Sequence, residues 1–257
     1  MTAGWDWEDP AAVEALTDEF MRGRTAVAKL EAVASTPVYG REQLARLGIT
    51  GIEFAALRTL HPTGLGSDLT GLRCGDTVTG RGELYRVDGE CHFVELDIQE
   101  PLPFADGCVD WVYAEHLIEH VSMTAAIGWL AEVHRILAPG GLLRLTTPDL
   151  RKYAEGYLRG DGFFAKHRGR MSKALGGVAP PMPARGAFMF NQLFYLYGHR
   201  WIYDLDELTH ALTRAGFDPA AIRVCGFRAG ARPDVAQLDQ MIRNDETIYV
   251  EADRRNV

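Results

Sequence analysis

Apolar and polar positions along the chain follow two different periods, and together they predict an α/β fold. Short apolar runs predict strands at residues 51–57, 92–98, 109–115, 142–148 and 246–252. Apolar residues at helical spacing predict helices at residues 10–35, 41–49, 124–137 and 204–217, with a further helix after Pro148. Strands that alternate with helices indicate a parallel sheet with crossover helices.

Three local signals refine these predictions. Ser122 precedes a helix and is a suitable N-cap, and the segment "APGG" at residues 138–141 ends that helix. Two helices before the first strand suggest a helical cap at residues 1–50, ahead of an α/β domain at residues 51–257. Residues 160–185 are rich in Gly, Pro and basic side chains, so we expect a lid or insertion around residues 160–190.

Charge and cysteine content narrow the class of protein. The 257 residues carry a formal net charge of −8, which disfavours binding to nucleic acid. The basic segment at residues 159–173 is expected to be a solvated loop. We see no signal peptide and no apolar run long enough for a bilayer. The four cysteines lack CxxC spacing, so we expect reduced thiols in a cytoplasmic protein without a membrane partner.

One long segment, "LPFADGCVDWVYAEHLIEHV" followed by "LAEVHRILAPGGLLRLTTPDL", resembles the type-11-like group of class I S-adenosylmethionine (SAM) methyltransferases. The resemblance extends over about residues 52–253. It implies a Rossmann-like, doubly wound, mostly parallel sheet of seven strands. It also implies a cofactor that lies across the carboxyl ends of the first strands.

The glycine-rich cofactor loop of that family is missing. Where the family has Gly-x-Gly after the first strand, this chain has Ala55, Ala56 and Leu57, followed by Arg58. A left-handed backbone would cost such residues about 1–2 kcal/mol. The resemblance assigns Asp68 to the cofactor's ribose and Asp97 to its adenine, although both could simply cap neighbouring turns.

If SAM is retained, Ala55, Leu57, Asp68 and Asp97 would bind it. We favour the alternative, in which the cofactor has been dropped.

Acid/base side chains follow the fourth strand of the resemblance. Tyr113, Glu115, His116 and Glu119 are the candidate catalytic residues, because His and Glu can move protons near neutral pH. "HLIEH" also fits an H-x-x-E-H zinc pattern, but no further ligand stands out, so no metal is expected. Glu119 and His120 could instead brace the ends of helices.

A second polar cluster lies in "NQLFYLYGHRWIYD". In the family this stretch covers the substrate side of the pocket, and an arginine there could bind a carboxylate, phosphate or sulfate. The aromatic residues could equally be core, and Arg200 a surface charge. The candidate substrate-binding residues are Arg58, Asn191, Tyr195, His199, Arg200 and Tyr203.

Three functions follow from these patterns. The first is a SAM-independent enzyme that closes a ring in, or eliminates sulfate or phosphate from, a small natural-product intermediate, free or tethered to a carrier protein. The second is a SAM-dependent O- or N-methyltransferase. The third is a non-catalytic partner protein that docks through Trp5 and Trp7. The sequence leaves the oligomeric state open.

Overall fold

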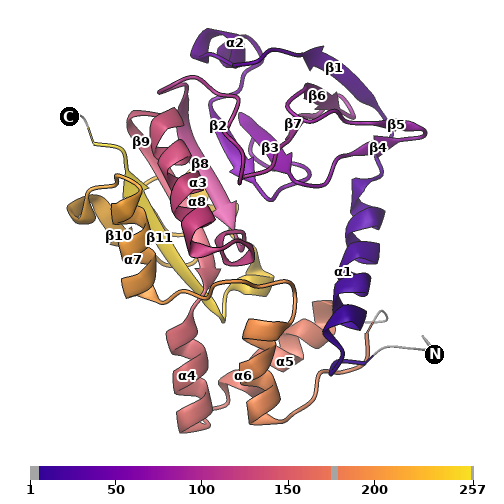
Figure 1. The fold of residues 1–257 in the computed structure, drawn as a ribbon, viewed down its shortest axis with the longest axis vertical. Helices are drawn as coiled ribbons and strands as arrows, with labels where there is room; N and C mark the ends of the chain where they lie inside the picture. Colours follow the sequence, from indigo (N-terminus) through magenta and orange to yellow (C-terminus); the bar gives the residue numbers. More distant parts are fainter. Residues whose placement is uncertain (1–5, 175–178, 256–257) are drawn as a thin grey trace.

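The computed structural model describes residues 6–174 and 179–255, and its centre is a nine-stranded sheet (Figure 1). The strand order is β1-β6-β7-β3-β2-β8-β9-β11-β10. The bounds are β1 Leu30–Ala34, β2 Gly51–Phe54, β3 Gly64–Asp68, β6 Leu84–Val87, β7 Cys91–Glu95, β8 Val109–Glu115, β9 Leu137–Pro148, β10 Ile222–Val224 and β11 Thr247–Asp253. A separate hairpin pairs β4 (Arg73–Cys74) with β5 (Thr77–Val78).

The middle five strands, β7 to β9, are parallel, and two strands at each edge continue the sheet in antiparallel pairing. Numbered along the chain, the seven strands from β7 to β10 have the order 3-2-1-4-5-7-6. The predicted α/β fold with parallel central strands is therefore confirmed. The sheet has nine strands instead of seven, because β6 and β1 extend the edge at β7.

The N-terminal region departs from the predicted pair of helices. Helix α1 (Pro10–Thr25) ends well before residue 35, so the predicted helix is wrong over β1, whose backbone pairs with β6. Helix α2 (Arg41–Arg46) forms as predicted. Tyr39 and Leu44 lie in the main hydrophobic core, so this region packs into the α/β domain.

One face of the sheet is covered by α3 (Met123–Ile136) and α7 (Leu205–Arg214). Apolar residues of α3, such as Trp129 and Val133, share the main core with Val112 and Ala114 of β8. Ser122 caps α3 as predicted, since the amide of Ala125 donates to its hydroxyl.

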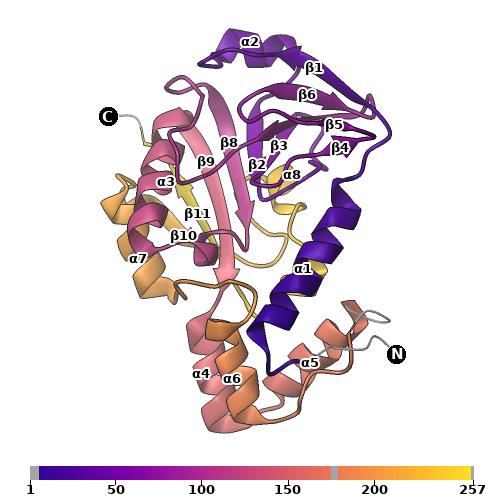
Figure 2. The same ribbon diagram turned by 45° about the vertical axis from the view of Figure 1, so that its right-hand side comes forward.

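The opposite face is covered by residues 226–245, the segment between β10 and β11 (Figure 2). This segment carries α8 (Pro233–Ala236) and the 3-10 helix η3 (Met241–Arg243); another 3-10 helix, η2 (Pro219–Ala221), precedes β10. Val235 and Leu238 pack against Trp111 and Tyr113, which alternate along β8 with the core residues of the other face.

No helix links β2 to β3. The nine residues from Ala55 to Thr63 return directly to the start of β3, although parallel strands usually need a crossover of about a dozen residues or more. The amide of Ala56 donates to the carbonyl of Ser67, which holds the loop against β3. The first crossover that the resemblance implies is therefore reduced to a loop.

Helices α4 (Leu150–Arg159), α5 (Phe163–Ala174) and α6 (Gly186–Tyr195) gather beyond the carboxyl ends of the parallel strands (Figures 1 and 2). The expectation of a solvated loop at residues 159–173 is wrong, because most of them form α5 and His167 is buried beside Tyr153. Over the described residues, no helix is both long and apolar enough to cross a bilayer.

Candidate functional site

The candidate site begins where β8 ends. His116 has a left-handed backbone with φ 51°, which is costly for a residue with a Cβ, and its amide donates to the carbonyl of Thr146 on β9. A short 3-10 helix, η1 (Ile118–His120), follows at once. This tight turn places three ionisable side chains, His116, Glu119 and His120, at the carboxyl end of the sheet.

His116 and Glu119 form a buried ion pair. Nδ1 of His116 lies 3.2 Å from Oε1 of Glu119, and their side chains are 4% and 0% exposed. Burial opposes ionisation of Glu119, but the facing charge of His116, with smaller contributions from His120 and His199, lowers its pKa to about 2. Glu119 is therefore an anion inside the protein.

Hydrogen bonds fix the ring of His116. The hydroxyl of Thr247 donates to the carbonyl of Arg243, so its oxygen accepts a hydrogen bond of 2.8 Å from Nε2 of His116. The second oxygen of Glu119 accepts a hydrogen bond of 3.1 Å from the hydroxyl of Thr147. Both nitrogens of His116 face partners, so this histidine holds Glu119 and is poorly placed to act as a free base.

His120 and His199 complete a group that we call the Glu119 cluster: Glu119, His120 and His199. The two imidazole rings pack edge to face with centroids 5.0 Å apart. Nδ1 of His199 donates to the carbonyl of Leu193 at 2.7 Å, which leaves Nε2 with a free lone pair. Burial lowers the pKa of His120 to about 4 and also lowers the pKa of His199, so both rings are neutral at pH 7.

A second buried acidic group adjoins the cluster. The hydroxyl of Tyr153 donates to Glu246, and His167 lies between Glu246 and Asp245. Burial opposes protonation of His167, but the nearby carboxylates of Asp245, at 3.6 Å, and Glu246 raise its pKa. Neither His167 nor Glu246 was predicted, because they meet only when α5 packs against η3.

Two predicted catalytic residues, Glu115 and Tyr113, do not belong to the Glu119 cluster. Glu115 uses one carboxylate oxygen to accept the amide of Gln240, and burial raises its pKa. Tyr113 is buried beneath the segment of residues 226–245, with its hydroxyl 3.4 Å from Asp239. Burial raises the pKa of Tyr113 far above its usual range, so this hydroxyl stays protonated.

The predicted substrate residues are divided among three places. His199 lies in the Glu119 cluster, and Arg200 is next to it, exposed, with its amide donating to the carbonyl of Glu119. Tyr203 is fully buried in the main core, with its hydroxyl against the sulfur of Met123. The structure therefore brings His199 and Arg200 to the candidate catalytic residues and leaves Tyr203 as a packing residue.

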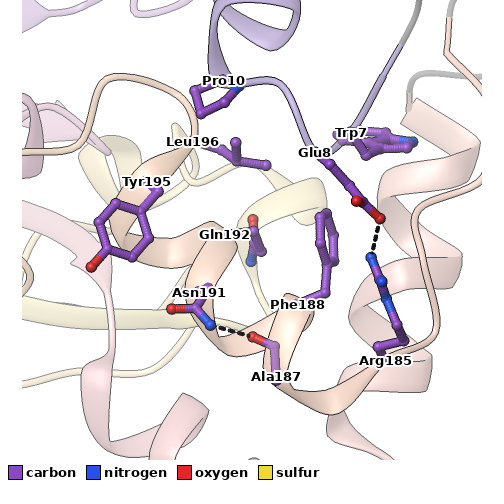
Figure 3. Close-up of a pocket in the computed structure, with 10 residues that line it drawn as sticks. All are labelled: Trp7, Glu8, Pro10, Arg185, Ala187, Phe188, Asn191, Gln192, Tyr195 and Leu196. Atoms are coloured by element: carbon purple, nitrogen blue, oxygen red, sulfur yellow. Dashed lines mark hydrogen bonds and ion pairs between the residues drawn. The ribbon is translucent and has the colours of Figure 1, made fainter.

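Asn191 and Tyr195 line a separate cavity of about 350 Å³ between α6 and the N-terminal segment (Figure 3). Trp7 is 5% exposed there and donates its indole N–H to the carbonyl of Pro180. The proposed docking residue Trp7 is thus packed against its own chain, while Trp5 lies outside the described residues.

Arg58 does not reach the cluster. The loop after β2 doubles back toward the amino end of β7, where Arg58 forms an ion pair of 2.7 Å with Asp88. Leu57 is buried with Leu72, Val87 and Phe93.

The first turn of the expected SAM site contains no glycine. Ala55 has φ 56°, so the backbone keeps the left-handed turn that the family builds with glycine. The loop then closes onto the sheet: a Cβ on Gly66 would lie 2.8 Å from the carbonyl oxygen of Ala56. The turn is therefore packed against β3, and no glycine backbone is presented to a ligand.

The two family aspartates cap turns. The amide of Thr70 donates to Asp68, and the amide of Gln99 donates to Asp97, each at 2.9 Å. Burial raises the pKa of Asp68. The turn-capping role that the sequence left open is thus present at both positions.

Comparison with known proteins identifies the fold. Residues 50–145, from β2 into β9, match the family profile described as a methyltransferase domain. Together with the strand order, this match gives the chain a class I SAM methyltransferase fold, as the resemblance implied. Comparison with curated proteins gives no match.

Three solved structures show remote similarity. A SAM-dependent methyltransferase from Mesorhizobium loti is 17% identical, over 83% of this chain and 96% of that one, with a TM-score of 0.42. A possible histamine N-methyltransferase from Thermotoga maritima is 14% identical, over 80% and 82%, with a TM-score of 0.42. PigF with SAH is 15% identical, over 63% and 35%, with a TM-score of 0.36, so this chain spans about a third of its length.

Proposed function

We propose that this chain is an enzyme that keeps the methyltransferase fold, works without SAM, and uses the Glu119 cluster for acid/base and leaving-group chemistry. The observation that carries this proposal is the loop from Ala55 to Thr63, which replaces a crossover helix and packs Leu57 into the protein. Beyond the carboxyl end of β8, the strand next to β2, lie a buried carboxylate and two neutral imidazoles. The connection at the expected cofactor site is therefore short, whereas the region after β8 gathers several ionisable side chains.

The reaction that fits these groups is intramolecular. A nucleophilic O–H or N–H of a small natural-product intermediate would give up its proton at the cluster and attack carbon as the C–O bond to a sulfate or phosphate breaks. In an elimination, a C–H would give up its proton to the cluster, and its electron pair would form a C=C bond as the C–O bond breaks. Alignment of nucleophile and leaving group contributes much of the rate in such reactions.

Cations are available for the departing anion. The side chain of Arg243, at the end of η3, is 42% exposed. Its charge lies close enough to both Glu115 and His120 to lower the pKa of each. Arg200 is exposed beside His199. We propose a small-molecule substrate, free or carried on a partner protein, and a cytoplasmic location, which suits the four free cysteines.

A SAM-dependent methyltransferase is the second candidate, and the family match over residues 50–145 supports it. In that case Asp68 and Asp97 would bind the nucleoside with the carboxylate oxygens that their turns leave free. The neutral ring of His199 would accept the proton of the methyl acceptor.

Calorimetric titration of the full chain with SAM, and separately with S-adenosylhomocysteine, tests the choice. We expect no binding below about 1 mM, an affinity that corresponds to only about 4 kcal/mol. Micromolar binding that Asp97→Ala abolishes would overturn SAM independence and establish the methyltransferase alternative. Micromolar binding that survives Asp97→Ala would also overturn it, with the ligand at a different place.

A further inference from the structure

The structure assigns a divalent transition-metal site to Glu119, His120 and His199, with Zn²⁺ the best chemical match. Each residue offers one ligand atom, and the three atoms lie within 4.8 Å of one another. Two imidazoles and one carboxylate form a recognised zinc ligand set that leaves a fourth position open. Ideal zinc geometry needs separations of roughly 3.3 Å, so small side-chain rotations would close the set.

The surroundings favour a metal over a merely structural cluster. One oxygen of Glu119, Oε1, faces Nδ1 of His116 at 3.2 Å without a hydrogen bond of good geometry, although the side chain is completely buried. A carboxylate oxygen has two lone pairs, so this contact leaves Oε1 able to bind a cation as well. A cation between this residue and the two neighbouring rings would use that lone pair.

The ring of His199 is already oriented as a metal ligand. The hydrogen bond from Nδ1 of His199 to the carbonyl of Leu193 orients the ring and leaves Nε2 as the ligand atom, the usual arrangement around zinc. The hydroxyl of Thr147 donates to the other carboxylate oxygen of Glu119, Oε2, and fixes this side chain.

This arrangement differs from the H-x-x-E-H pattern in the sequence. His116, the first residue of that pattern, points its Nε2 at Thr247 and is not a ligand. The third ligand, His199, comes from the segment after α6, nearly eighty residues later in the chain. With a metal bound, these ligand atoms could not take a proton, so a metal-bound water in the open position would serve as the base, and the metal would act as a Lewis acid at the site of the proposed reaction.

The test uses the full chain, freed of metal by a chelator and titrated at pH 7 with Co²⁺ and then Zn²⁺. We expect one Co²⁺ per chain with visible d–d absorption, displaced by Zn²⁺. His120→Gln and His199→Gln should each weaken binding by about 100-fold or more, and Thr147→Val by about 10-fold. His210→Gln, at an exposed histidine outside the cluster, is the matched control and should bind normally. Circular dichroism and thermal melting would confirm that each variant folds.

Two results would overturn the site: no Co²⁺ binding below about 0.1 mM, or binding that folded His199→Gln retains in full. The metal titration contains no SAM, so its outcome is separate from that of the proposed function. A chain that binds both Zn²⁺ and SAM would keep the metal site and lose SAM independence. A chain that binds neither would lose the metal site and keep SAM independence.

Discussion

Arg144 and Asp239 are joined by a guanidinium–carboxylate contact of 2.6 Å in which both side chains are completely buried. Arg144 projects from β9, whereas Asp239 belongs to the segment of residues 226–245. The same guanidinium also reaches Glu251 on β11 at 2.9 Å. This contact therefore fastens the covering segment to the face of the sheet.

Loss of one partner should be costly, because the remaining charge stays buried. We expect Asp239→Ala to lower the free energy of unfolding by about 3–5 kcal/mol, measured by urea denaturation. Asp253→Ala is the control: it removes a partner of Arg223 in a half-exposed pair and should cost about 1 kcal/mol or less. Equal losses in the two variants would show that the segment is not held by the buried pair.

Glu53 on β2 gives the protein a pH dependence of known sign. Burial raises the pKa of this carboxyl to about 7, against an ordinary value of 4.5. The folded chain then holds the proton more tightly than the unfolded chain. The contribution of Glu53 to the free energy of unfolding is therefore fully present below pH 4.5 and is lost as pH rises through 7. The difference amounts to about 3 kcal/mol.

Urea denaturation between pH 5 and pH 8 would measure this loss. We expect Glu53→Gln to remove it, so that the variant is more stable than the parent at pH 8. Glu90→Gln, at an exposed glutamate, should leave the pH profile unchanged. A parent profile that already matches that of Glu53→Gln would contradict the raised pKa.

Ala55 tests whether the missing glycines alone account for the altered loop. Because Ala55 has φ 56°, Ala55→Gly should raise the free energy of unfolding by about 1 kcal/mol. Ala56→Gly is the matched control and should lower it, because Ala56 has no positive φ. Calorimetry on Ala55→Gly should still show no SAM binding, since the loop stays packed on β3; micromolar binding would refute that explanation.

Trp7 anchors α1 to the helices beyond the sheet. It shares a small cluster with Val13, Met182 and Leu196, separate from the main core. Trp7→Ala should therefore release the N-terminal segment and α6 without unfolding the sheet, seen as faster amide hydrogen exchange in these segments alone. Uniformly faster exchange throughout the chain would show instead that the cluster supports the whole fold.

Sequence reasoning succeeded where structure is decided locally. The Ser122 cap and the strand at residues 109–115 each depend on neighbouring residues, and both were predicted. It failed for β1, because an edge strand forms only when a distant partner, β6, is present. The resemblance pointed to the carboxyl end of β8, where the structure places His116 and Glu119.

The details of the site depend on tertiary packing. Nothing in the pattern around His199 shows that its ring will meet His120, since the two come from different segments. Arg58 was expected at the pocket because the family loop runs toward the cofactor, but the short return to β3 carries it to Asp88. The segment between β10 and β11 likewise shows no apolar periodicity from which its position over the sheet could be predicted.

The helixless link between β2 and β3 also bears on how the chain folds. Closing a loop of nine residues costs about 1 kcal/mol less entropy than closing a strand–helix–strand crossover of about 30 residues. Parallel pairing is normally slow to form because its contacts are distant in sequence. Here the β2–β3 pair is local, so we expect it to be among the earliest parts of the sheet to assemble, with the edge strand β1 joining later.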